Sequence, residues 1–317
     1  MAALALSVVI CTRNPRADYF SRTLEALRGQ TLLADRWELL VIDNCSDEPL
    51  EGRIELSWHP SARIMREQTL GLTPTRLRGI DEAVGELLVF VDDDNVLDPD
   101  FLEVALRTAE EKPFLGSWSG QCRPEFETPP PDWTRRYWGN LVIREFEQDV
   151  WSNLPRLPDT MPCGAGLCVR RQVADHYIRL HEQGARGFQF GRAGDSLLSG
   201  EDNDLAACAC DVGLGVGLMS ALKLTHLMSP ERFTAEYHAR LAEGIFFSAV
   251  VLARLRASES ELASYQVRWH EPLRALLKPW PHRGIQLATI RGRRRGLRFA
   301  ASLGHQSPRG TAASSSA

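Results

Sequence analysis

Apolar positions in the first third of the chain follow two patterns that alternate. Short continuous apolar runs predict buried strands, and they lie at Ser7–Thr12, Trp37–Asp43, Ala62–Glu67 and Glu86–Val91. Segments with apolar side chains on one side predict helices, and they lie at Phe20–Gln30, Asp100–Glu111 and from Thr73 to about Ala83. Strands that alternate with helices of this length predict an α/β fold, with a mostly parallel central sheet and helices on both of its faces.

The second half of the chain has a different composition. The segment Phe114–Pro162 holds four tryptophans, so we interpret it as excursions packed by aromatic side chains. Helices are predicted at Arg171–Glu182, Asp202–Cys210 and Phe233–Ala257, with a glycine-rich loop over Gly184–Gly200. We therefore expect one α/β domain over residues 1–230, with halves 1–112 and 113–230, a helical extension over 231–281 and a basic, partly disordered tail over 282–317.

Charge is distributed unevenly along the chain. It has 37 Lys plus Arg and 41 Asp plus Glu, but nine of the cations follow Glu271, the last acidic residue. Residues 1–271 thus carry 28 cations against 41 anions, a balance of −13, which makes a nucleic-acid partner unexpected. In the tail, arginines alternate with apolar residues such as Ile285 and Ile290, a composition compatible with a solvated tail or with peripheral contact to an anionic membrane.

Few segments carry information on the cellular compartment. The longest apolar runs, Ala2–Cys11 and Gly244–Ala253, are shorter than the roughly 20 residues that a spanning helix needs. The first run has no basic segment before it and no small-residue cleavage pattern after it, so we interpret it as a strand and not as a signal peptide. We expect a cytoplasmic protein, and the tail leaves open a peripheral place at the inner face of the membrane.

Polar residues follow three of the predicted strands. They form the groups Thr12–Asn14, Asp43–Asp47 and Asp92–Asn95. In an open parallel sheet, ligands bind beyond the carboxyl ends of the strands, so these three groups are expected at one site.

The run Asp92–Asp94 is the strongest of these signals. Asp92 and Asp94 can project carboxylates to the same side, and hard oxygen ligands of this kind suit Mg²⁺ or Mn²⁺ bridged to substrate phosphates. The alternative is an acidic turn in which Asp98 caps the next helix. Three adjacent carboxylates repel one another unless a cation or hydrogen-bond donors offset them, which favours the metal interpretation.

Asp43 and two arginines each allow two interpretations. Asp43 could only form a turn, or its carboxylate could accept a hydrogen bond from a base or a ribose hydroxyl. Arg76 and Arg78 could both face solvent, or one of them, near a helix N-terminus, could hold a phosphate or order the aspartates.

Together these residues resemble the inverting family 2 glycosyltransferases of the GT-A fold. The resemblance covers residues 6 to about 112 strongly, and four pieces in order carry it: Val8–Asn14, Leu40–Asp47, Gly71–Gly79 with Ala83–Glu86, and Val89–Asp94. It implies a nucleotide-diphosphate sugar donor, UDP-, GDP- or dTDP-linked, and a divalent cation, Mn²⁺ or Mg²⁺. It also implies a sugar or lipid-linked sugar as acceptor.

The resemblance assigns roles to single residues. It places Thr12 and Asp43 near the base, Arg76 near the donor, Asp92 near the ribose or sugar and Asp94 on the metal. The full set that it implies for nucleotide-sugar binding is Thr12, Arg13, Asp43, Asn44, Gly71, Arg76, Asp92 and Asp93.

The second half supplies candidates for catalysis. Glu201 and Asp202 resemble the family's Glu-Asp segment, and Asp202 matches the general base that inverting transfer needs, although an acidic helix N-terminus explains the same residues. His226 is the candidate second metal ligand, with a structural hydrogen-bonding histidine as the alternative. The sugar pocket is predicted to include Gly164, Ala165 and Trp133, although core packing also explains the tryptophan.

Three further features of the sequence bear on the reaction. The processive signature Gln-x-x-Arg-Trp is one residue short at Gln266–Trp269, so we expect transfer of one or few sugars. The run around Asp92 and Asp94 also resembles the motif of haloacid-dehalogenase-type phosphatases, but there the motif opens the fold, and here three βα-like segments precede it. A non-catalytic sugar-binding descendant of the GT-A fold is the third reading, and the presence of Asp202 argues against it.

Overall fold

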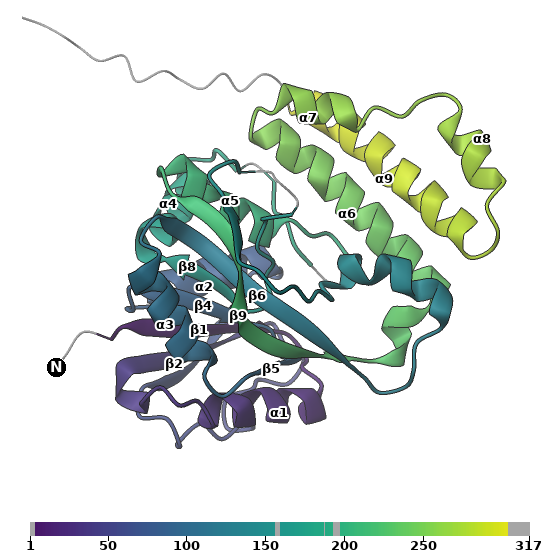
Figure 1. The fold of residues 1–317 in the computed structure, drawn as a ribbon. Helices are drawn as coiled ribbons and strands as arrows, with labels where there is room; N and C mark the ends of the chain where they lie inside the picture. Colours follow the sequence, from purple (N-terminus) through teal and green to yellow (C-terminus); the bar gives the residue numbers. More distant parts are fainter. Residues whose placement is uncertain (1–3, 156–158, 187, 193–196, 304–317) are drawn as a thin grey trace, which may run out of the picture.

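The computed structural model describes residues 4–155, 159–186, 188–192 and 197–303. Its centre is a nine-stranded sheet in the order β3-β2-β1-β4-β8-β6-β9-β5, with β7 paired to β9 (Figure 1). The longest pairings, β1 with β2, β2 with β3 and β6 with β9, are parallel. The prediction of an α/β fold with a mostly parallel sheet is confirmed.

The first half forms as the apolar runs predict. The strands β1 (Leu6–Thr12), β2 (Trp37–Asn44), β3 (Ala62–Glu67) and β4 (Leu87–Val91) make one parallel unit. Strands β2 and β4 are buried along their whole length, which explains their continuous apolar sequence. The register aligns Thr12 with Asp43 and Ile10 with Val91, so the polar groups after β1, β2 and β4 lie at one edge.

The second half departs from the prediction between residues 114 and 162. Instead of beginning as an aromatic excursion, this segment opens with the twelve-residue strand β6 (Leu115–Phe126). The remaining strands are β5 (Asn95–Leu97), β7 (Val150–Ser152), β8 (Leu167–Arg170) and β9 (Gly215–Met228). Only after β6 does the chain run through a short helix, η2 (Asp132–Leu141), that carries three of the aromatic side chains.

Helices cover both faces of the sheet. One face packs against α1 (Ala17–Arg28) and α3 (Phe101–Glu111), whose buried Phe20, Leu27, Phe101 and Leu102 share a core cluster with β1 and β2. The other face packs against α2 (Leu72–Glu82), α4 (Arg171–Glu182) and α5 (Glu201–Asp211). A single turn, η1 (Ala34–Arg36), leads into β2.

The C-terminal part is a layer of helices beside the sheet (Figure 1). After η3 (Pro230–Phe233) come α6 (Ala235–Leu255), α7 (Glu259–Ser264), α8 (Glu271–Leu276) and α9 (His282–Ser302). Residues 282–302, expected to belong to a basic, partly disordered tail, form a packed helix instead: Ile285 and Ile290 are buried, and α9 packs along α6. At Gly292 an added Cβ would lie 2.3 Å from the backbone oxygen of Glu243, so the absence of a side chain permits this close packing. The prediction of disorder beyond residue 303 lies outside the described residues.

None of the helices in the described part of the chain combines the length and the apolar character needed to cross a bilayer.

Candidate active site

The loops after β1 and β2 are bonded to each other. The backbone nitrogen of Asn14 donates to Ser46 Oγ at 2.9 Å, and its side chain exchanges two hydrogen bonds with Asp47, at 3.0 and 2.9 Å. Asn14 takes a positive φ of 49°, which asparagine tolerates better than most residues. Arg13 lies at this junction and donates to the backbone oxygen of Cys45 at 3.3 Å.

Asp43 is buried below this junction. Its Oδ1 accepts from the backbone nitrogen of Ser46 at 3.0 Å, its Oδ2 accepts from that of Leu50 at 3.2 Å, and Arg66 lies 3.7 Å away. The carboxylate therefore shapes the loop after β2, and a contact from Asp43 to a base stays a prediction.

Asn44 fixes the start of α2. Its side-chain nitrogen donates to the backbone oxygen of Thr69 at 2.8 Å, and its oxygen accepts from the backbone nitrogen of Gly71 at 2.8 Å. Gly71 has a φ of 137°, in a region that favours glycine. This arrangement sends α2 past the ends of the strands and carries Arg76 into the site.

Arg76 lies buried at the centre of an acidic group, with only 3% of its surface exposed. Its Nη1 is 3.4 Å from Glu201 Oε1 and its guanidinium lies over the ring of Phe90. Burial alone would lower the pKa of Arg76, but the charges of Glu201, Asp202 and Asp92 raise it instead. The sequence left open whether Arg76 or Arg78 lies in the site. The structure places Arg76 there.

Arg78 lies outside this group. It is exposed and pairs with Glu82 one turn along α2, at 2.6 Å.

Two buried atoms of this group have no hydrogen-bond partner among the described residues. They are Arg76 Nη1 and Glu201 Oε2. Burial raises the pKa of Glu201 to about 7, and Arg76 offsets part of that effect. Buried polar groups are normally satisfied by hydrogen bonds, so a buried ion pair in which each group keeps an atom without a hydrogen bond is typical of a site that binds a polar ligand.

Asp202 comes next on α5 and faces a glycine. Its Oδ2 accepts from the backbone nitrogen of Gly164 at 2.7 Å. A Cβ at Gly164 would lie 2.7 Å from Arg76 Nη2 and 3.4 Å from Asp202 Oδ2, so Gly164 lies between the two charged groups. Ala165, by contrast, is buried in the core below.

The three aspartates after β4 have distinct surroundings. Asp93 accepts a hydrogen bond from Thr12 Oγ1, while burial and the charge of Asp94 raise the pKa of Asp93 to about 7. Burial and Asp94 likewise raise the pKa of Asp92. Burial alone would also raise the pKa of Asp94. The charges of His226 and Arg232 outweigh burial and lower the pKa of Asp94 below its usual range.

Asp94 and His226 converge on one point because β5 pairs with β9. The register sets Asn95 opposite His226, which brings His226 Nε2 to 3.4 Å from Asp94 Oδ2. Arg232 lies against both: its Nη2 donates to Asp94 at 2.5 Å, and its Nη1 is 3.0 Å from His226 Nε2. A carboxylate oxygen suits Mn²⁺ or Mg²⁺ and a neutral imidazole nitrogen is a common metal ligand, so Asp94 and His226 are the residues that would hold a divalent cation once Arg232 moves aside.

Arg232 and Arg192 are site residues that the sequence reasoning missed. Arg192, on the loop before α5, is exposed, and its charge opposes the rise in the pKa values of Asp92 and Glu201 and adds to the fall in that of Asp94. A single arginine in a loop or in a short turn of helix such as η3 has no local signature, so only the fold brings these two to the carboxylates. The available hint was the glycine-rich loop that holds Arg192.

Trp133 lies in an aromatic cluster on η2. Its ring contacts Tyr137, His238 and His282, with centroid distances of 5.5 to 6.3 Å, so it packs against α6 and α9. A sugar contact from Trp133 stays a prediction, and core packing explains its present neighbours.

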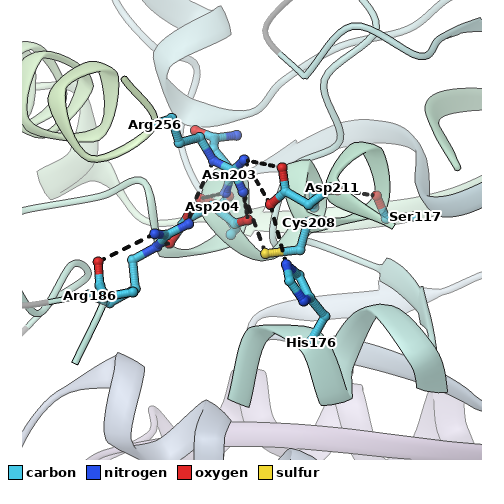
Figure 2. Close-up of polar contacts among 11 residues, drawn as sticks. Ser117, His176, Arg186, Asn203, Asp204, Cys208, Asp211 and Arg256 are labelled. Atoms are coloured by element: carbon cyan, nitrogen blue, oxygen red, sulfur yellow. Dashed lines mark hydrogen bonds and ion pairs between the residues drawn. The ribbon is translucent and has the colours of Figure 1, made fainter. Parts of the chain in front are cut away.

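A second charged cluster anchors α5 from its other side (Figure 2). Asp204 is fully buried and pairs with Arg186 at 2.6 Å and with Arg256 at 2.9 Å. Arg256 also donates to Asp211 at 3.1 Å and to Cys208 at 3.4 Å.

The same cluster contains three residues that could in principle hold a metal. His176, Cys208 and Asp211 place ligand atoms within 4.8 Å of one another. The guanidinium of Arg256 already neutralises this group, so we interpret it as an ion-pair cluster that ties the end of α6 to α5.

The sequence matches the model of a known family. The model of glycosyl transferase family 2 matches residues 7–176, more than half of the chain. The chain belongs to glycosyl transferase family 2, as the motifs of its first half predicted.

One curated relative matches beyond the first half. It is the glucosyl-dolichyl phosphate glucuronosyltransferase of Haloferax volcanii, 26% identical over 198 residues, which are 61% of this chain and 59% of the relative. The match thus covers less than two thirds of this relative's length. It covers only 33% of the length of a second relative, the putative glycosyltransferase EpsH of Bacillus subtilis.

Two solved structures have the same fold. A mannosyltransferase of Pyrobaculum calidifontis, solved with GDP-Man and Mn²⁺, has a TM-score of 0.55 at 17% identity, over 95% of this chain and 74% of its own. TarS of S. aureus has a TM-score of 0.53 at 16% identity, over 94% of this chain and 55% of its own. These similarities establish the GT-A type of fold.

Proposed function

We propose that this protein transfers one sugar from a nucleotide-diphosphate sugar to an acceptor hydroxyl, with inversion at the anomeric carbon. One observation carries the proposal. Arg76 lies among Asp92, from the first half of the α/β domain, and Glu201 and Asp202, from its second half, and two buried atoms of this group have no hydrogen-bond partner among the described residues. A site of this kind can hold a donor on one side and a base on the other.

Asp202 is the proposed general base. Direct displacement requires the acceptor hydroxyl to lose its proton as it attacks, and a positioned carboxylate can take it. The hydrogen bond from the backbone of Gly164 orients Asp202, and the pairing of Glu201 with Arg76 fixes the first turn of α5 beside it. Glu201 is thus a positioning residue in this proposal.

The donor is proposed to lie along the ends of β1, β2 and β4. Thr12, Arg13, Asp43 and Asn44 with Gly71 would surround the nucleoside, while Asp92 and Asp93 would face the ribose or the sugar. Arg76, together with Arg192, offers positive charge for the diphosphate.

A divalent cation is proposed at Asp94 and His226. When bound, it would neutralise charge on the diphosphate leaving group. Asp94 and His226 already point at one position, and Arg232 supplies a cation to them within the protein itself.

The acceptor is proposed to be a sugar or a lipid-linked sugar. The relative from Haloferax volcanii carries a dolichyl phosphate in its name, which supports a lipid-linked class. The phosphatase alternative loses its basis, because family membership and Asp202 both favour glycosyl transfer. The non-catalytic alternative is tested by the experiment below.

The test is a screen of UDP-, GDP- and dTDP-sugars, with Mn²⁺ or Mg²⁺, for binding by calorimetry and for nucleotide release. We expect one donor class to bind and to be hydrolysed slowly without acceptor. Asp94→Ala should abolish metal-dependent donor binding, whereas Asp202→Asn should keep donor binding and lose transfer. The exposed Asp81→Asn is the matched control and should change neither.

The two variants separate the two parts of the proposal. If no nucleotide binds, the assignment of a donor site is wrong. If donor binds without any turnover in the wild-type protein, the non-catalytic reading replaces ours. If Asp94→Ala and Asp202→Asn behave alike, the division between donor side and base is wrong.

A further inference from the structure

The segment around α8 exposes five large apolar side chains. Their exposed fractions are 81% for Trp269, 56% for Leu273, 50% for Leu276, 85% for Leu277 and 79% for Trp280. Leu273 and Leu276 lie on α8, Trp269 lies just before this helix, and Leu277 and Trp280 follow it. We call this set the Trp269–Trp280 face.

The opposite side of the same segment is held by the protein. Ala275 is fully buried, and α8 packs on α9. Arg293 of α9 donates to Glu271 at 2.6 Å and to the backbone oxygen of Tyr265 at 2.9 Å. In Figure 1, α8 lies at the outer edge of the molecule, with α9 between it and α6. The Trp269–Trp280 face therefore points away from the protein because its other side is fixed.

Positive charge accompanies this face. Arg268, Arg274 and Arg283 are exposed within the same stretch, and Lys278 is half-buried. Glu271, the one acidic residue between positions 262 and 317, is bound by Arg293. Farther along α9, Arg294 and Arg298 are exposed as well. The exposed charged residues of the stretch 268–283 are thus cationic, although residues 1–271 are acidic overall.

Exposed tryptophan and leucine residues with arginine and lysine beside them are typical of segments that lie in the interface of an anionic bilayer. A second copy of this chain would bring the same cations together, which repel. The last residues of the sequence, 304–317, hold no large apolar side chain that could cover the face. Charge complementarity therefore selects an anionic lipid surface as the occupant.

We propose that the Trp269–Trp280 face docks this protein on an anionic membrane, with Trp269, Leu277 and Trp280 entering the interface and the arginines contacting lipid phosphates. This differs from docking through a free basic tail, because Ile285 and Ile290 are buried against α6. Docking needs no donor and no acceptor, so it is independent of the proposed transfer reaction.

The test is co-sedimentation of the full chain with vesicles of phosphatidylcholine, alone or mixed with phosphatidylglycerol. We expect binding to the mixed vesicles only, reduced by salt. The triple variant Trp269→Ser, Leu277→Ser and Trp280→Ser should bind the mixed vesicles about tenfold more weakly than the wild type, or more weakly still. Its matched control replaces exposed apolar residues elsewhere, Leu33→Ser with Leu154→Ser, and should bind like the wild type.

A second variant and a second measurement keep the test decisive. Arg274→Glu with Lys278→Glu retains the apolar residues and should also lose binding to the mixed vesicles. Tryptophan fluorescence should shift to the blue with mixed vesicles, and the shift should vanish when Trp269 and Trp280 are replaced. Unfolding curves check that each variant is folded.

Three outcomes would overturn the proposal. They are equal binding to both kinds of vesicle, no binding by the wild-type chain, and binding that survives replacement of the Trp269–Trp280 face. A wild-type dimer in light scattering that becomes a monomer in the serine variant would also overturn it, because a second copy would then cover the face.

Discussion

Arg232 donates a hydrogen bond from Nη2 to Asp94 Oδ2 at 2.5 Å, across 138 positions of the sequence. Its Nη1 lies 3.0 Å from His226 Nε2, so one guanidinium contacts both proposed metal ligands. Burial would lower the pKa of Arg232, but Asp94 raises it, so the guanidinium stays charged. A fixed cation and a divalent ion cannot occupy the same position beside Asp94, so metal binding requires Arg232 to move.

We therefore expect Arg232 to weaken metal binding by the nucleotide-free protein. Arg232→Gln should bind Mn²⁺ about tenfold more tightly, because a charge-assisted hydrogen bond no longer competes for Asp94. Electron paramagnetic resonance of free Mn²⁺ during a titration measures this without any turnover. The exposed Arg28→Gln is the control and should not change Mn²⁺ affinity. Equal affinity in Arg232→Gln and the wild type would contradict the competition.

The ion pairs at Asp204 should be important for stability. Arg256 pairs with Asp204, which is fully buried, and Arg256→Gln would leave part of that charge without a partner. Breaking a buried pair in this way costs about 3–5 kcal/mol. Urea unfolding should show this loss, whereas Arg78→Gln, which breaks an exposed pair, should cost about 1 kcal/mol or less. A cost at Arg256 as small as at Arg78 would mean that Arg186 alone compensates Asp204.

Sequence patterns predicted the parts of the fold that have a local signature. Strands β2 and β4 are buried on both sides and read as continuous apolar runs, so their positions were correct. Strand β6 was missed because it is rich in small and polar residues. At Gly120, for example, a Cβ would lie 2.1 Å from the backbone oxygen of Leu222, so only the tertiary pairing with β9 explains the residue.

The same distinction applies to α9 and to the site. The arginines of α9 predicted a tail, but Gly292 and Gly296 permit close packing on α6, and the arginines remain exposed or pair with Glu243 and Glu271. In the site, Thr12 and the aspartates after β4 could be predicted, because ligands bind beyond the carboxyl ends of parallel strands. Arg232 comes from another element and carries no motif, so its contact with Asp94 could not be predicted from the sequence.

The pH dependence of stability should report on Glu201. Its pKa in the folded protein is raised from 4.5 to about 7, chiefly by burial. Between these pH values the folded state holds a proton that the unfolded chain has lost, so the contribution of Glu201 to the free energy of unfolding is full below pH 4.5 and is lost as the pH rises through 7.

Glu201→Gln keeps a neutral side chain at every pH. The difference in the free energy of unfolding, Glu201→Gln minus wild type, should therefore increase between pH 4.5 and 8, by roughly 1 kcal/mol or more. Chemical unfolding at a series of pH values measures the difference. The exposed Glu259→Gln should give a difference that is flat with pH, and a flat difference for Glu201→Gln would contradict the raised pKa.

Gly164 should be intolerant of even one added methyl group. A Cβ there would lie 2.7 Å from Arg76 Nη2 and 3.4 Å from Asp202 Oδ2, and buried Arg76 has little room to withdraw. We expect Gly164→Ala to cost about 1–3 kcal/mol of stability and to lower nucleotide release with the donor found by the screen, because the guanidinium is displaced from Glu201. The control is Gly139→Ala, where no atom lies within 4 Å of the added Cβ. If both alanine variants unfold and turn over like the wild type, Arg76 is mobile, and its place between the first half of the α/β domain and Asp202 does not depend on the glycine.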